Sequence, residues 1–172
     1  MVMLLDIHQA YDSHPFVPLC LDASVPLFAL SPPYPPAMVE INVVYAGNKK
    51  CDLRHPEGAT LRTDAPKDIG GDATGFSPTD LAAASLATCV VTTMAMFAAR
   101  HGLELAGIRA EVQKHMTTPP APRRIQRLPV VVHLPQTVPA DMRQRLENVG
   151  NTCPVKLSLH PEIDAPIEYR YE

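Results

Sequence analysis

The feature that most constrains the fold is a run of nineteen residues without a charged side chain, from Leu81 to Ala99. Wound as a helix, this run is apolar on all sides, so it has to be covered all round. It is long enough to span a bilayer. Its many alanines, its serine and threonines and its few leucines favour instead the buried central helix of a soluble protein. We therefore expect no membrane partner.

Capping residues mark both ends of this helix. Ser77 can cap the first turn, Pro78 suits the first helical position, and Asp80 can return a hydrogen bond to the cap. Gly102 is the residue type that commonly ends a helix. The sequence therefore predicts a helix over residues 78–101, about 36 Å long at 1.5 Å per residue.

Alternating and β-branched segments on both sides of this helix predict strands. Pro129 requires a bulge or an edge position within its strand. Strands and helices in this order give an α+β fold. The expected strands are 39–45, 50–54, 59–63, 107–115, 124–134 and 167–171, the expected loop is 64–75, and the further helices are 139–149, ended by Gly150, and a short helix that begins at Cys153.

Residues 1–37 differ from the rest of the chain. They hold seven of the nineteen prolines and no lysine or arginine. Without a basic segment they do not resemble a secretory signal or a transit peptide. We expect a proline-rich extension that is dispensable for folding, or a stretch ahead of the true start at Met38. The domain itself is expected to span residues 38–172.

Composition narrows the possible partners. The net charge is -3 and the chain has no cluster of lysine or arginine, which argues against a nucleic-acid partner. Four cysteines in 172 residues are too few for a disulfide scaffold, so a reducing, cytoplasmic setting is expected. The cysteines do not form close pairs and the histidines show no ligand spacing. We expect neither a metal nor another cofactor.

Two cysteines stand in distinct settings. Cys89 lies mid-way along the long helix, where it can be a packed core residue or, beside a cation, a reactive thiol. Its neighbours at helical spacing carry hydroxyls, which fit a polar pocket as well as a satisfied helix face. Cys153 lies where Thr152 can cap a helix, and the helix dipole would favour a thiolate there, although a structural role fits too. A thiol peroxidase needs two thiols that the fold brings together, one to attack and one to resolve.

The segments around both cysteines resemble a known family. Gly70-Gly71 followed by residues 77–89 resembles the signature of the OsmC/Ohr family of hydroperoxide-handling proteins, in which a proline, an acid and a Leu-Ala-rich helix lead to a cysteine. Cys153-Pro154-Val155 resembles the second cysteine motif of that family. The resemblance covers residues 38–172.

This resemblance implies a fold, an assembly and a chemistry. The fold would be OsmC-like, with two small sheets packed around a long central helix in an intertwined homodimer. Cys89 would be the peroxidatic thiol and Cys153 the resolving thiol. The substrate would be an organic hydroperoxide, and the reductant a dithiol such as a lipoyl group, or another thiol.

Two positions depart from the best-known peroxidase branch. There the acid directly follows the proline, where this chain has Thr79; Asp80, one position later, matches the OsmC-like branch. The active-site arginine of the family comes from the N-terminal strands, where Arg62 is our choice and Arg54 competes with it. Asp80 would orient that arginine.

Two other readings of the chain remain open. One is a non-catalytic stress-response or small-ligand-binding dimer on the same fold. The other is a generic α+β domain whose cysteines are merely packed. An arginine within reach of Cys89 in a dimer would favour the enzyme over the non-catalytic dimer.

Overall fold

The computed structural model describes residues 38–172. The predicted extension 1–37 lies outside the described residues, and so does Cys20. The fold is α+β, as the sequence predicts. Its elements are β1 (Asn42–Gly47), β2 (Lys50–Arg54), β3 (Thr60–Asp64), the short 3-10 helix η2 (Lys67–Ile69), α1 (Pro78–Arg100), β4 (Arg109–Val112), β5 (His115–Met116), β6 (Ile125–Arg127), β7 (Val130–Leu134), α2 (Ala140–Asn151), α3 (Pro154–Ser158) and β8 (Ile167–Tyr171).

The predicted caps of α1 are confirmed. The Ser77 hydroxyl accepts a hydrogen bond from the backbone N–H of Asp80, and the Asp80 carboxylate accepts one from the backbone N–H of Ser77 at 2.8 Å. At the other end Gly102 adopts a φ of 64°. That left-handed turn lets the N–H of Leu103 donate to the carbonyl of Ala98 at 2.9 Å, which closes the helix.

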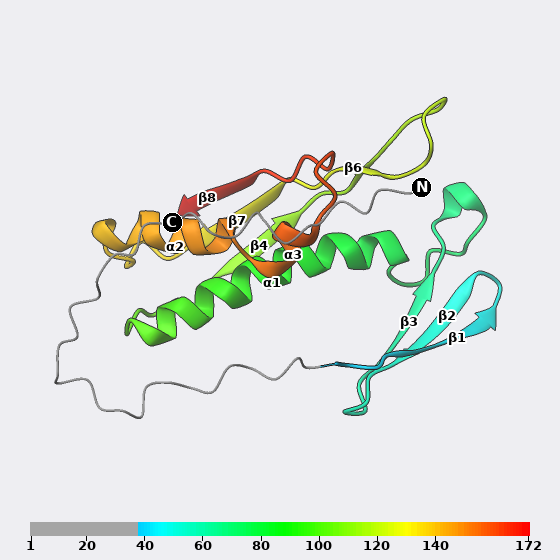
Figure 1. Ribbon diagram of the computed structural model, residues 1–172, viewed down its shortest axis with the longest axis horizontal. Helices are drawn as coiled ribbons and strands as arrows, with labels where there is room; N and C mark the ends of the chain where they lie inside the picture. Colours follow the sequence, from blue (N-terminus) through cyan, green and yellow to red (C-terminus); the bar gives the residue numbers. More distant parts are fainter. Residues whose placement is uncertain (1–37) are drawn as a thin grey trace, which may run out of the picture. The chain divides into compact units, whose positions relative to one another are not determined.

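The core lies where α1 packs against the sheet of β4, β7 and β8 and against α2 and α3 (Figure 1). Leu86, Val90 and Met94 recur at helical spacing and are fully buried. Burial of a side chain of this size contributes roughly 1.5–3 kcal/mol. The buried partners of this helix face come from β7, from the segments next to it and from α2: Leu128, Val130, Val132, Leu134, Val138 and Leu146.

Hydrogen-bond partners divide two of the predicted strands. β7 is the centre of its sheet, antiparallel to β4 and parallel to β8. β5 and β6 pair with each other in a separate ribbon. The predicted strand 124–134 is therefore two strands, which meet at Pro129, and 107–115 is likewise split into β4 and β5. Proline has no N–H to donate to a ladder, so the break at Pro129 follows from its chemistry.

The sheet of β1, β2 and β3 has two unlike faces. Its antiparallel register aligns Val43 with Leu53 and Leu53 with Leu61 on one face. The other face carries Asp52 and Arg62. Val43 is 59% exposed and Leu61 38% exposed, so the apolar face is not covered by the single chain.

A buried carboxylate holds the loop between β3 and α1. Asp64 accepts hydrogen bonds from the backbone N–H and the hydroxyl of Thr74, at 2.8 and 2.7 Å. These two bonds lower the pKa of Asp64 to about 2. The backbone N–H of Asp64 also donates to the carbonyl of Phe76 at 3.1 Å. The loop is thereby fixed directly ahead of the Ser77 cap.

α1 is only partly covered within one chain. It has the length and composition of a membrane-spanning helix, a test that the core helix of a soluble protein also passes. One face is buried as described above. The opposite face, with Ser85, Thr88, Thr92 and Met96, is exposed. The sequence predicts that α1 is buried on all its faces, and within the described chain this burial is incomplete.

Gly150 does not end α2, contrary to the prediction from sequence. The helix continues to Asn151, and Gly150 is buried inside it. A Cβ atom there would lie 2.5 Å from the hydroxyl of Tyr169 and 3.1 Å from the sulfur of Met94. Tyr169 is held in place because its hydroxyl donates to the carbonyl of Glu147 at 3.1 Å. Glycine is present for close packing rather than for chain termination.

The substitution Gly150→Ala tests this packing. Alanine in a helix interior is normally favoured over glycine by about 1 kcal/mol. Here we expect instead a loss of about 1–3 kcal/mol from overpacking, measured by chemical denaturation. The double variant Gly150→Ala/Tyr169→Phe removes the nearest atom, so it should recover part of the loss in a double-mutant cycle. A stabilised Gly150→Ala protein would contradict this account.

Candidate active site

The fold brings the two predicted cysteines together. Cys89 is half-buried in the middle of α1 and packs against the core. Cys153 lies between α2 and α3 and is completely buried within that core. Contact between α1 and α3 places the Cys153 thiol close enough to Cys89 for the two groups to interact electrostatically. Both cysteines are free thiols.

The electrostatic setting of Cys153 differs from the prediction. Burial, followed by the proximity of Cys89, raises the pKa of the Cys153 thiol above its ordinary value. The backbone N–H and the charge of Lys156 act in the opposite direction but do not prevail. α3 has only five residues, and the Cys153 sulfur makes no capping hydrogen bond to it. The first turn of α3 thus acts on Cys153 in the predicted direction, but burial outweighs it.

Thr152 also has another role than predicted. It closes α2 rather than capping α3, and its hydroxyl donates to the carbonyl of Asn148 at 3.0 Å. Cys153 itself occupies the cap position of α3, and Pro154 follows at the first helical position. The second cysteine thus sits in the tight turn between two helices.

Two hydroxyls near Cys89 bond back to the helix. Ser85 donates to the carbonyl of Ala82 at 2.8 Å, and Thr93 donates to the carbonyl of Cys89 at 2.7 Å. Thr92 instead lines a pocket between α1 and the start of β4, so a polar pocket and a satisfied helix face are both represented. The Cys89 thiol therefore depends on Cys153 and on groups outside this helix for its reactivity.

Asp80 has the two partners expected of it, but its cation is a lysine. Besides the Ser77 cap, its carboxylate accepts a hydrogen bond from the ammonium of Lys114 at 2.5 Å. The same ammonium donates to the hydroxyl of Thr79 at 2.9 Å. Burial acts to raise the pKa of Asp80, but the hydrogen bonds from Lys114 and Ser77 outweigh it and lower that pKa. Within the described chain, Asp80 orients Lys114 and not an arginine.

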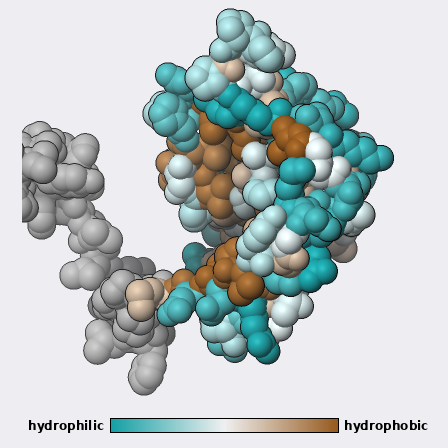
Figure 2. Space-filling model, turned by 90° about the vertical axis from the view of Figure 1, so that its right-hand side faces the viewer, coloured by the Kyte–Doolittle hydropathy of each residue, from teal (hydrophilic) through white to brown (hydrophobic). Residues whose placement is uncertain are grey.

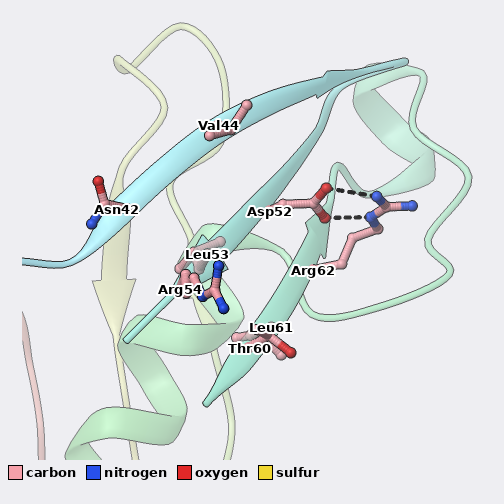
Figure 3. A pocket seen from close by; sticks show the side chains of 8 residues that line it. All are labelled: Asn42, Val44, Asp52, Leu53, Arg54, Thr60, Leu61 and Arg62. Atoms are coloured by element: carbon pink, nitrogen blue, oxygen red, sulfur yellow. Dashed lines mark hydrogen bonds and ion pairs between the residues drawn. The ribbon is translucent and has the colours of Figure 1, made fainter. Parts of the chain in front are cut away.

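Arg62 does not reach the cysteines within the described chain. Its guanidinium pairs with Asp52 across β2 and β3, with nitrogen–oxygen distances of 2.5 and 2.7 Å. Figure 3 shows this pair, together with Arg54, lining an open pocket on the polar face of the β1–β3 sheet. Within residues 38–172, no hydrogen bond or ion pair joins Arg62 or Arg54 to Cys89. Neither predicted arginine therefore acts on Cys89 within one chain.

The described residues also show no arrangement suited to a metal ion. In residues 38–172 no group of three or more histidine, cysteine, aspartate or glutamate side chains could hold one.

Comparison with known proteins identifies the fold. The model of the OsmC family, described as OsmC-like protein, matches residues 70–168, more than half of the chain. The chain belongs to the OsmC-like family. The match begins at Gly70 and includes both cysteine motifs, which are the segments that carried the resemblance. A search of curated proteins finds no match.

Solved structures agree with this OsmC-like assignment. A structure from Psychrobacter arcticus 273-4, provisionally named an osmotic stress induced and detoxification response protein, is 33% identical; the alignment covers 79% of this chain and 98% of that one, with a TM-score of 0.71. An organic hydroperoxide resistance protein OsmC from Legionella pneumophila is 16% identical over 79% and 98%, with a TM-score of 0.60. An organic hydroperoxide resistance protein from Elizabethkingia anophelis is 12% identical over 81% and 99%, with a TM-score of 0.64. The last two similarities concern the fold alone.

Sequence reasoning missed three parts of this OsmC-like site. Lys114 lies 34 positions from Asp80, and nothing in its local sequence indicates the pairing. Tyr169 and Gly150 meet only through the packing of β8 against α2. Lys156 was the one detectable partner, because it follows Cys153 by three positions in the same helical turn.

The pair of Asp80 and Lys114 predicts a pH dependence. The folded pKa of Asp80 is lowered, so its contribution to stability is present above the unfolded pKa and is lost as pH falls through about 4 and below. Asp80→Asn should therefore lower the melting temperature at pH 7, with a cap contribution of about 1 kcal/mol, and should differ less from wild type at pH 3. Lys114→Met retains the capping box and is the matched control. An equal deficit of Asp80→Asn at both pH values would refute the ionic contribution.

Proposed function

We propose that this OsmC-like protein is a thiol-dependent peroxidase that reduces organic hydroperoxides through Cys89 and Cys153. The observation that carries the proposal is the meeting of these two free thiols at the contact of α1 and α3. The names of the Legionella and Elizabethkingia structures, both organic hydroperoxide resistance proteins, agree with it. A cytoplasmic setting, in which thiols stay reduced between turnovers, suits the free cysteines.

The proposed cycle assigns different roles to the two sulfurs. Cys89 is the half-exposed one, so a hydroperoxide can reach it, whereas Cys153 is fully enclosed. Cys153 also holds its proton more tightly than an ordinary thiol, because burial raises its pKa, which makes it the poorer group for the first attack. A Cys89 thiolate that attacks the O–O bond becomes a sulfenic acid and releases the alkoxide, which takes up a proton to give the alcohol.

Resolution then follows from proximity. The Cys153 sulfur displaces the hydroxyl of the sulfenic acid, which leaves as water, and an intramolecular disulfide forms. For that bond the two Cα atoms have to come within roughly 4.4–6.8 Å. A dithiol such as a lipoyl group, or another thiol, returns the protein to its reduced form.

We propose that the working form is a homodimer. Two surfaces are left uncovered in one chain: the uncharged exposed face of α1, which carries Ser85, Thr88, Thr92 and Met96, and the apolar face of the β1–β3 sheet. Figure 2 shows patches of hydrophobic surface on the face that is turned to the viewer. A second copy would cover such surfaces and could bring an arginine, Arg62 or Arg54, to the Cys89 of its partner.

The alternative is a non-catalytic stress-response or small-ligand-binding dimer. One observation favours it: Thr79 stands where the peroxidase branch has its acid, and the neighbouring Asp80 is engaged by Lys114. In that case the thiols would be packing residues and peroxide would be consumed no faster than by the free thiol Cys51.

Cysteine substitutions separate these functions. Cys89→Ser should abolish consumption of cumene hydroperoxide in the presence of a dithiol, and Cys153→Ser should allow one turnover and leave Cys89 as sulfenic acid or over-oxidised. Cys51→Ser removes a half-buried thiol of β2 and is the matched control. Mass spectrometry of peroxide-treated wild type should show the disulfide of Cys89 and Cys153. Two free thiols after complete peroxide consumption would favour the alternative.

Neighbouring valines on opposite faces of β1 test the dimer. Val43→Asp places a charge on the apolar face, and Val44→Asp places it on the face of Asp52 and Arg62. We expect a dimer for wild type and Val44→Asp and dissociation for Val43→Asp in sedimentation at micromolar concentration. A folded wild-type monomer under these conditions would exclude the dimer.

A further inference from the structure

The two sulfurs of the candidate site differ in what can reach them. Cys153 has no exposed surface and is enclosed by the core, whereas Cys89 is partly exposed. Thiol–disulfide exchange requires the incoming sulfur to approach along the S–S axis, so access decides which sulfur is attacked. An external thiol therefore has a route to one end of the Cys89–Cys153 bond only.

The sulfur that is not attacked has to leave as a thiolate inside the core. Burial disfavours that charge, as the raised pKa of Cys153 already indicates. A buried leaving thiolate needs a donor or a cation beside it. Lys156 meets both needs, because its backbone N–H and its charge both stabilise the ionised form of Cys153.

The ammonium of Lys156 is held in place. Lys156 is half-buried, and its Nζ donates to the side-chain oxygen of Asn151 at 3.1 Å. Asn151 is the last residue of α2, two positions before Cys153, so this bond folds the lysine back over the turn that carries the cysteine. The cation thus sits on the Cys153 side of the sulfur pair.

We propose that the reducing dithiol attacks the sulfur of Cys89, and that Lys156 stabilises the Cys153 thiolate that leaves. This inference rests on the proposed two-cysteine function and adds to it the site of attack by the reductant. Lys156 is a further residue of the site: it acts where Cys153 carries the negative charge, and the first attack of Cys89 on the peroxide does not involve it.

Reduction of the protein disulfide takes two exchange steps. A thiolate of the dithiol forms a bond to Cys89, the Cys89–Cys153 bond breaks, and Cys153 departs with the electron pair and then takes up a proton. The second thiol of the reductant, after losing its proton, attacks the sulfur bound to Cys89 and releases the Cys89 thiolate. The dithiol is oxidised to a disulfide by two electrons, and the protein disulfide is reduced.

Trapping identifies the attacked sulfur directly. The full-length protein is oxidised with diamide, which forms the disulfide without peroxide chemistry, and is then treated briefly with the monothiol 2-mercaptoethanol. After an acid quench and alkylation, peptide mapping should find the 2-mercaptoethanol adduct on Cys89 and the alkylated thiol at Cys153. An adduct chiefly on Cys153 would overturn the proposal.

A charge-removing variant tests the role of Lys156. Lys156→Met keeps the length of the side chain, and we expect it to slow reduction of the oxidised protein by a dithiol by about three- to tenfold. The rate of the first oxidation by cumene hydroperoxide should not change, and Lys156→Arg should restore most of the reduction rate. Lys67→Met, on the exposed η2 helix, is the matched control. Equal slowing of the first peroxide attack and of the reduction would indicate a merely structural role and refute the proposal for Lys156.

These outcomes are distinct from failure of the proposed function. If peroxide yields no disulfide but diamide does, the peroxidase is refuted while the order of attack can still be read by trapping. If diamide also yields no disulfide, the two sulfurs do not meet and both proposals fail.

Discussion

The burial of α1 organises the domain. A helix with no charge along nineteen residues is stable in water only if other elements cover it. The β4–β7–β8 sheet covers one side, and α2 and α3 cover another. Cys89 lies on this helix and Cys153 on the turn between α2 and α3 that packs against it. The packing that hides the helix is therefore the same packing that brings the thiols together.

Enclosure of Cys153 has opposing effects on its chemistry. It protects the thiol from adventitious oxidation and keeps it next to Cys89, but it also raises the pKa of the thiol. A buried sulfur is a slow nucleophile and a poor leaving group unless its negative charge is stabilised. The position of Lys156 in the following turn offsets part of that cost. The closeness of Cys89 and the charge of Lys156 together compensate for the loss of solvent around the Cys153 sulfur.

Local signals in the sequence were sufficient for some features and not for others. The caps of α1 depend on residues within four positions of each other, so Ser77 and Asp80 could be recognised directly. The local sequence predicts that Gly150 ends α2, but its role is set by packing against Tyr169, nineteen positions away in another element. Lys114 was likewise hidden, since its partner Asp80 lies across the fold. The direction of the pKa shift of Cys153 depends on burial, which one sequence does not reveal.

The pattern of charges on β2 and β3 specifies how these strands align. Val43, Leu53 and Leu61 distinguish the apolar face of the sheet, but this pattern does not fix the register, because a slip of two residues keeps every side chain on its face. In the observed register Lys50 stands opposite Asp64 and Asp52 opposite Arg62, so each pair joins opposite charges.

A slip of two residues would keep the same faces but would reverse this match. In one direction Asp52 would stand opposite Asp64 and Arg54 opposite Arg62; in the other, Lys50 would stand opposite Arg62. Like charges directly across a ladder are destabilising, so the sequence penalises both misalignments. The exposed ion pair of Asp52 and Arg62 thus helps to fix the register of β2 and β3, which the hydrophobic pattern of the sheet does not fix.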